Sequence, residues 1–112
     1  MRLFRRGVKH GDGDAERALY VHLALDGGIF VVRGETGEQL WTDREGLHRE
    51  LERTRKRAGI LLYSREAGDE EPPRHVEETF RQILEYRLPI QLLEEPHPEA
   101  NVPADRRRDI LG

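Results

Sequence analysis

The residues able to carry out catalysis or bind a metal are few in this chain and lie far apart. Its 112 residues include five histidines and no cysteine, and Ser64 is the one serine. No two histidines have the spacing that places a zinc-binding pair on one helix or strand, and no thiolate can complete such a site. Ser64 has no G-x-S-x-G motif around it, and we expect it to cap a turn. We therefore predict no catalytic residue, no metal and no cofactor.

Carboxylates are abundant but do not form a recognisable site. Asp12, Asp14 and Glu16 match the first, third and fifth positions of a calcium loop. Arg17 and Leu23 then stand where such a loop needs glycine and glutamate, so a flexible acidic linker is the better interpretation.

The charge balance bounds the class of partner. The chain has 22 acidic and 19 basic residues and a net charge of −3, which argues against a main role in holding a polyanion. Four basic side chains, Arg53, Arg55, Lys56 and Arg57, gather near the end of a predicted helix. Cations there complement the helix dipole without any ligand, although weak contact with nucleic acid through them stays open as a third reading.

No stretch of the sequence predicts a membrane anchor. No apolar run approaches the ~20 residues of a membrane-spanning helix. Residues 1–7 are basic but are not followed by the apolar stretch of a signal peptide. We therefore expect a cytoplasmic location and no membrane insertion.

Hydrophobic periodicity predicts the elements that must position these residues. Alternation predicts strands at 19–25 and 29–33, joined by a turn at Asp26-Gly27-Gly28. Short apolar runs predict strands at 60–63 and 90–93, with a further short strand at 39–41 left open. Helical spacing predicts one helix between Thr42 and Gly59, with Thr42 and Glu45 as a capping box and Gly59 as the left-handed end. A second helix is predicted between Pro73 and Pro89.

The order of these elements predicts the fold class. We expect an α+β two-layer sandwich of order β-β-α-β-α-β, with two helices on one face of a four-stranded sheet. The domain should span residues 18–94. Residues 1–17 are predicted to be a flexible basic and glycine-rich lead-in, and residues 95–112 a proline-containing tail that includes a possible short helix.

One face of the predicted sheet suggests a contact surface. Leu19, Val21, Leu23 and Leu25 alternate with Tyr20, His22 and Ala24, so the two sets face opposite ways. Helices on a single face leave the other face more exposed. We therefore hypothesise that an exposed patch of Tyr20, His22, Phe30 and Val32 binds a partner protein or a second copy of the chain.

The span from about residue 21 to residue 93 resembles the soluble domain of the ExbD/TolR family, partners of ion-driven motors in bacterial envelopes. Asp26-Gly27, with Ile29-Phe30-Val31-Val32, is similar to the first hairpin of the family. Gly34-Glu35 is similar to its next turn, and Glu45-Gly46-Leu47 to its first helix. The membrane helix of the family is absent, and Tyr86-Arg87-Leu88-Pro89 replaces the glycine that usually ends the second helix. The resemblance implies this fold and a role in interaction, without the motor function.

These observations predict a non-catalytic protein–protein interaction or accessory module of a bacterial system, with self-association as one form of it. An alternative is a small-ligand-binding or enzymatic domain that uses the loop of residues 64–71, from Ser64 to Glu71, after the third predicted strand, where α/β sheets bind ligands.

Overall fold

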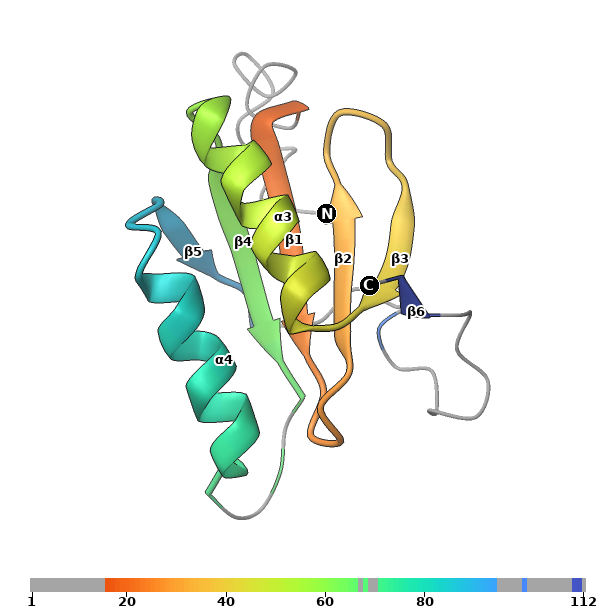
Figure 1. Ribbon diagram of the computed structural model, residues 1–112, viewed down its shortest axis with the longest axis vertical. Coiled ribbons are helices and arrows are strands. Elements are labelled where there is room, and N and C mark those ends of the chain that lie inside the picture. Colours follow the sequence, from red (N-terminus) through yellow and green to blue (C-terminus); the bar gives the residue numbers. More distant parts are fainter. Residues whose placement is uncertain (1–15, 67, 69–70, 95–99, 101–109, 112) are drawn as a thin grey trace.

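A computed structural model describes residues 16–66, 68, 71–94, 100 and 110–111 of the chain. They form an α+β fold in which one mixed sheet is combined with two helices (Figure 1). The strands are β1 (Ala18–Leu23), β2 (Ile29–Arg33), β3 (Gln39–Thr42), β4 (Ile60–Arg65), β5 (Ile90–Leu92) and β6 (Ile110–Leu111). The helices are α3 (Arg44–Lys56) and α4 (Arg74–Leu84). No helix in these ranges is long and apolar enough to cross a membrane.

The strands lie side by side in the order β5-β4-β1-β2-β3-β6. β1, β2 and β3 form an antiparallel meander, whereas β4 runs parallel to β1 and β5 runs parallel to β4. The predicted number of four strands is therefore too low. β3 contributes a short strand whose pattern was ambiguous. β6 is two residues that pair with Trp41 and Thr42 of β3, too short to leave a hydrophobic period.

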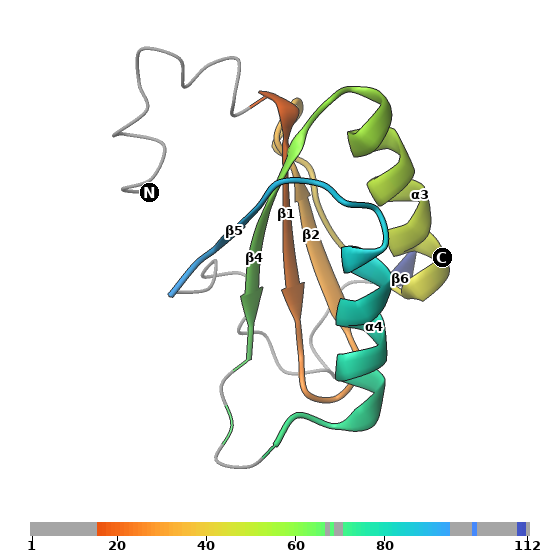
Figure 2. The ribbon, with the colours of Figure 1, turned by 90° about the vertical axis from the view of Figure 1, so that its left-hand side faces the viewer.

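Both predicted helices lie on one face of the sheet, as expected (Figure 2). The core between helices and sheet contains Leu47 and Leu51 of α3 and Val76 and Ile83 of α4. From the sheet it takes Leu19, Val21 and Leu23, the set that alternation placed on one face. Burial of this apolar stripe of each helix is the main source of its stability.

The turn between β1 and β2 has the conformation that its sequence predicts. Gly27 has a φ of 99°, which glycine adopts without steric cost. The Gly28 N–H donates to the Asp26 side chain at 2.9 Å, and the Ala24 N–H donates to the Gly28 carbonyl at 2.9 Å. The hairpin predicted at 19–33 is confirmed by the antiparallel pairing of Leu23 with Ile29.

The residue that caps α3 is Asp43, not Thr42 as predicted. Its side chain accepts a hydrogen bond from the Gly46 N–H at 2.8 Å. Thr42 is buried and is the last residue of β3, where it pairs with Ile29. Because Thr42 is held in the sheet by strand pairing, Asp43, the next residue whose side chain carries a capping oxygen, takes the N-cap position of the helix.

The left-handed residue that ends α3 is Ala58, with a φ of 56°, rather than Gly59. The Ala58 N–H donates to the Arg55 carbonyl and the Gly59 N–H to the Thr54 carbonyl, which is the Schellman arrangement shifted by one residue from the prediction. Gly59 is needed for a different reason. A Cβ at Gly59 would clash with the Arg17 carbonyl oxygen. The chain between α3 and β4 thus passes too close to the backbone of Arg17 for any residue with a side chain to stand at position 59.

Parts of the predicted terminal segments lie outside the described residues. This holds for residues 1–15 of the lead-in and for residues 103–109 of the possible short helix. The backbone of Ile110 and Leu111, which the prediction placed in the tail, belongs to the sheet as β6.

Candidate functional site

The four residues predicted to form an exposed patch do not form one. Tyr20, His22 and Phe30 are 5%, 1% and 2% exposed, and Val32 is half-buried. A second apolar cluster covers this face, in which Tyr20 and Phe30 pack with Trp41, Leu62 and Ala100. The expectation that this face is open was therefore wrong, and it offers no surface for a partner while it is packed in this way.

A buried polar cluster lies within this second face. The Ser64 Oγ is 2.6 Å from the Tyr20 hydroxyl and 2.7 Å from the His22 Nδ1, because His22 and Ser64 pair directly across β1 and β4. A serine beside a histidine is also the arrangement of an activated nucleophile. Here Ser64 is 3% and His22 1% exposed, so no substrate reaches the oxygen. Ser64, which lies inside β4, is the hydrogen-bond partner of two buried polar side chains of β1 and does not cap a turn.

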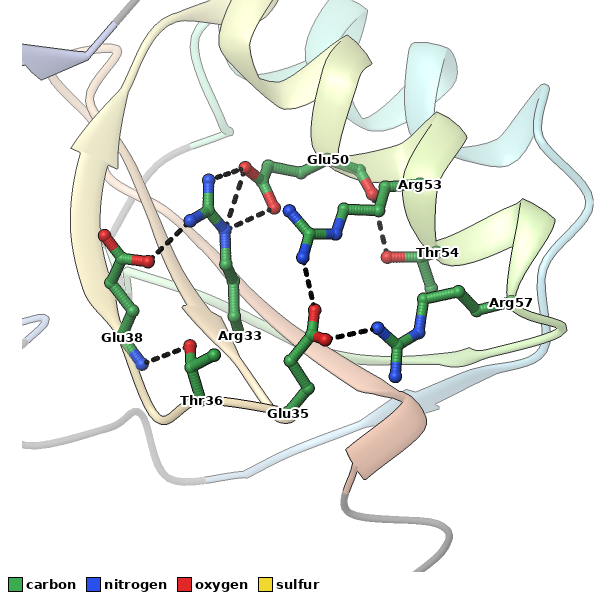
Figure 3. Close-up of polar contacts among 8 residues, drawn as sticks. All are labelled: Arg33, Glu35, Thr36, Glu38, Glu50, Arg53, Thr54 and Arg57. Carbon is green, nitrogen blue, oxygen red and sulfur yellow. Dashed lines mark hydrogen bonds and ion pairs between the residues drawn. The ribbon is translucent and has the colours of Figure 1, made fainter.

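Three of the four basic side chains at the end of α3 have carboxylate partners, two of them shown in Figure 3. The Arg53 and Arg57 guanidinium groups each lie 2.5 Å from one oxygen of Glu35. The Arg55 guanidinium lies 2.7 Å from Glu52 and above the Tyr86 ring. A polyanion would have to displace these partners, which weakens the third reading, contact with nucleic acid.

A second ion pair ties β2 to α3 in the same region (Figure 3). The Arg33 guanidinium donates to both oxygens of the buried Glu50 and, at 2.5 Å, to Glu38. Hydrogen bonding to Glu50 raises the pKa of Arg33 above its ordinary value, against the smaller opposing effect of burial. Each of these three charged side chains, Arg33, Glu38 and Glu50, has a partner. Their ion pairs therefore hold the β2–β3 hairpin against α3.

A hollow in the described part of the chain lies between α4 and β5. We call it the α4–β5 hollow, and its volume is about 690 Å³. Its apolar walls are Val76, Phe80 and Leu84 of α4, and Leu92 with the adjoining Leu93 at β5. Leu84 and Leu92 are 47% and 69% exposed and are the large exposed hydrophobic side chains of the described residues.

The hollow arises because α4 and β5 diverge from each other, and because β5 is shorter than β4, the strand with which it pairs. Figure 2 shows β5 running away from α4 as it leaves their common end. β5 has three residues and β4 has six, and the last pair in the register joins Tyr63 to Leu92. Among the described residues, the end of β4, including Arg65, therefore has no neighbouring strand on this side.

Tyr63 is the polar group at the floor of the α4–β5 hollow. It is 8% exposed, and its ring lies 4.9 Å from the Phe80 ring. Its hydroxyl has no hydrogen-bond partner among the described residues. Since no fully buried side-chain oxygen there lacks a partner, the hydroxyl must reach the space of the hollow. Burial raises the pKa of Tyr63, and nearby Arg65 opposes this.

The rim of the hollow carries charges of both signs, from Arg65, Glu66, Glu77 and Arg81. Glu66 is already engaged, because its Oε1 accepts a hydrogen bond from the Leu25 N–H at 2.7 Å. Among the described residues, Arg65 and Arg81 have no carboxylate within ion-pair distance. The predicted ligand loop, residues 64–71, thus borders the hollow through Glu66. The contribution of α4 was missed, although the four-residue spacing of Val76, Phe80 and Leu84 was a visible signal.

The outer edge of β5 is a free edge of the sheet among the described strands, and the two-residue strand β6 forms the opposite border. The Leu61 N–H donates to the Pro89 carbonyl and the Leu93 N–H donates to the Tyr63 carbonyl, so alternate residues of this segment face β4. Backbone groups of Ile90 and Leu92 then face outward. They have no strand beside them in the described part of the chain.

No group of three histidine, aspartate or glutamate side chains in the described ranges is placed to hold a metal ion. No family model matches this chain, and no curated protein or solved structure matches it. None of these comparisons links the chain to the ExbD/TolR family, so that resemblance stays a prediction. The α4–β5 hollow, with the free edge beside it, is the feature from which a function can be argued.

Proposed function

We propose that this protein is a non-catalytic interaction module that binds an extended segment of a partner protein at the α4–β5 hollow. The observation that carries the proposal is that Leu84 and Leu92, both exposed, line one hollow beside the free edge of the sheet. Exposed apolar side chains gathered at one place are typical of binding surfaces.

The edge of β5 supplies the backbone part of such binding. A segment that pairs with Ile90 and Leu92 would add a strand beside β5, with main-chain hydrogen bonds giving affinity. Its alternate side chains would point to the face on which α4 lies. An apolar residue there can enter the hollow between Phe80 and Leu92, which gives specificity.

A display library of random ten-residue peptides tests this proposal. Peptides enriched on the wild-type protein are expected to carry apolar residues at alternate positions, as strand pairing requires. The double variant Leu84→Glu and Leu92→Glu should bind them at least tenfold more weakly, because it places carboxylates on the apolar walls. Both residues are exposed, so the fold should survive, which circular dichroism checks.

Gln91→Glu is the matched control. Gln91 is exposed on the same strand as Leu92 but pairs with Leu62, a residue of the opposite face, so the control adds one carboxylate to β5, as Leu92→Glu does, but away from the hollow. This variant should bind like the wild type. Equal binding by the double variant, or no enrichment of any peptide, would refute the proposal.

A small apolar ligand is the second candidate. The volume of about 690 Å³ lies within the usual range of roughly 300–1,000 Å³ for ligand pockets. This reading keeps two residues of the predicted loop, Arg65 and Glu66, in the lining of the site. It predicts that a compound bound in the hollow competes with every selected peptide, and that no peptide exceeds the affinity of that compound.

A further inference from the structure

We infer that the segment bound in the α4–β5 hollow is the carboxyl terminus of the partner chain. The last side chain would be apolar and lie against Phe80, Leu84 and Leu92, while the terminal carboxylate would bind the Tyr63 hydroxyl and Arg65. This inference rests on the proposed function and adds to it the chemistry of the bound group.

The Tyr63 hydroxyl is the first argument. Tyr63 is 8% exposed as a whole residue, but its hydroxyl is not fully buried, because every fully buried side-chain oxygen of the described residues has a partner. This hydroxyl has no hydrogen-bond partner among the described residues, and Tyr63 lines the hollow. Burial raises its pKa, so the group keeps its proton at neutral pH and is a donor. A donor directed into an apolar space favours a ligand that carries an acceptor.

The charge around that hydroxyl is the second argument. Arg65 lines the hollow together with Tyr63, and its positive charge lowers the pKa of Tyr63 against the larger, opposite effect of burial. Arg65 also lacks an ion-pair partner among the described residues, while Glu66 is held by the Leu25 N–H. The acceptor favoured at this point is therefore an anion, because hydrogen bonds to a carboxylate from charged donors are the stronger kind.

The shape of the hollow is the third argument. Among the described residues, β5 stops at Leu92, opposite Tyr63, so no strand pairs with the end of β4 on this side. A segment that pairs with the outer edge of β5 has β5 between itself and β4, but its last residue can turn past Leu92 into the hollow, which Tyr63 and Arg65 line. An internal segment would offer a neutral carbonyl and leave Arg65 without a counter-charge.

Two arrays of the same acetylated random pentapeptides test the inference, one with free carboxyl ends and one with carboxamide ends. Binding is measured by fluorescence anisotropy on the full chain. Peptides with free ends and a last residue of leucine, isoleucine, valine or phenylalanine should bind at least tenfold more tightly than their amides. Equal affinity of acid and amide would overturn the inference and leave the proposed function standing. Absence of binding in both arrays and in the display library would refute both.

Tyr63→Phe is the sharpest variant, because the hydroxyl has no protein partner to lose. We expect unchanged thermal stability and about a tenfold loss of affinity for free-acid peptides. Arg65→Gln should weaken the acids but not the amides. Arg74→Gln is the matched control, since Arg74 is 90% exposed on α4 and pairs with Glu78, outside the hollow. Unchanged acid binding in both Tyr63→Phe and Arg65→Gln would overturn the inference.

A third arm separates a chain terminus from a free small acid. The probe is 4-methylpentanoate, which has the side chain of leucine and a carboxylate but no peptide backbone. We expect it to bind at least a hundredfold more weakly than the best pentapeptide, because it makes no strand hydrogen bonds. Affinity equal to that of the peptides would overturn the assignment to a chain terminus.

Discussion

The Ser64 hydroxyl holds two buried polar groups of β1 at once, the Tyr20 hydroxyl and the His22 Nδ1. Removing a shared partner from a buried cluster leaves donors or acceptors without the bond for which they were desolvated. We expect Ser64→Ala to lower the free energy of unfolding by about 1–3 kcal/mol, measured by urea denaturation. Thr36→Ala is the control, because Thr36 accepts only from the exposed Glu38 N–H and should change it by less than ~0.5 kcal/mol.

Ala58 carries a strained backbone at the end of α3, with a φ of 56°. Ala58→Gly removes the clash of Cβ in the left-handed region, partly offset by the greater freedom of glycine in the unfolded chain. We expect a gain of about 0.5–1 kcal/mol in the free energy of unfolding. Gly37→Ala is the reverse test. Gly37 has a φ of 75° with nothing within 4 Å of an added Cβ, so the loss measures backbone strain, reduced by the lower freedom of alanine in the unfolded chain, without any steric clash. A loss of stability in Ala58→Gly would contradict this account.

Single positions were predictable to within one residue at the two ends of α3. The sequence offers two capping residues in succession, Thr42 and Asp43, and two residues that could end the helix, Ala58 and Gly59. The choice between them depends on the pairing of Thr42 with Ile29 in the sheet and on the closeness of Gly59 to Arg17. Both are contacts between distant parts of the chain, which local spacing does not contain.

At the scale of elements, ion pairs join the β2–β3 hairpin to α3. Glu35 in the hairpin binds Arg53 and Arg57 of the helix end. The bond from Arg57, with a smaller contribution from Arg53, lowers the pKa of Glu35 below its ordinary value of 4.5. A carboxyl whose pKa is lower in the folded state stabilises that state above its unfolded pKa, and the contribution is lost as the pH falls through the folded pKa.

We therefore expect Glu35→Gln to lower the melting temperature slightly at pH 7 and to reduce its fall below about pH 4.5. Differential scanning calorimetry at low salt measures both, since salt screens such exposed pairs. Glu71→Gln is the control, because Glu71 is exposed and has no ion pair among the described residues. Identical pH profiles for wild type and Glu35→Gln would show that these pairs contribute nothing to stability.

The faces of the strands were predictable, but their burial was not. Alternation placed Leu19, Val21 and Leu23 opposite Tyr20 and His22, and the structure has the same division. The prediction then took the second face to be open, because it counted only the two helices as cover. Packing around Tyr20 includes Ala100, a residue far along the chain whose local sequence contains no sign of this contact.

For the molecule as a whole, the α4–β5 hollow could not be derived from any one element. The apolar row of α4 belongs in part to the core, since Val76 is buried. Leu84 of the same row is exposed because β5 turns away from the helix. The angle between two elements is set by tertiary packing, so a cavity between them has no signature in either sequence pattern.

The placement of β6 also limits how copies of this protein can assemble. β6 pairs with β3 and forms one border of the sheet, and β5 forms the other among the described strands. Two copies joined by their β5 borders in antiparallel fashion would close as a twofold-symmetric pair, because each copy has one such border. Further growth would then have to use the β6 border, which is two residues long, and edge strands this short are poor templates for adding another chain.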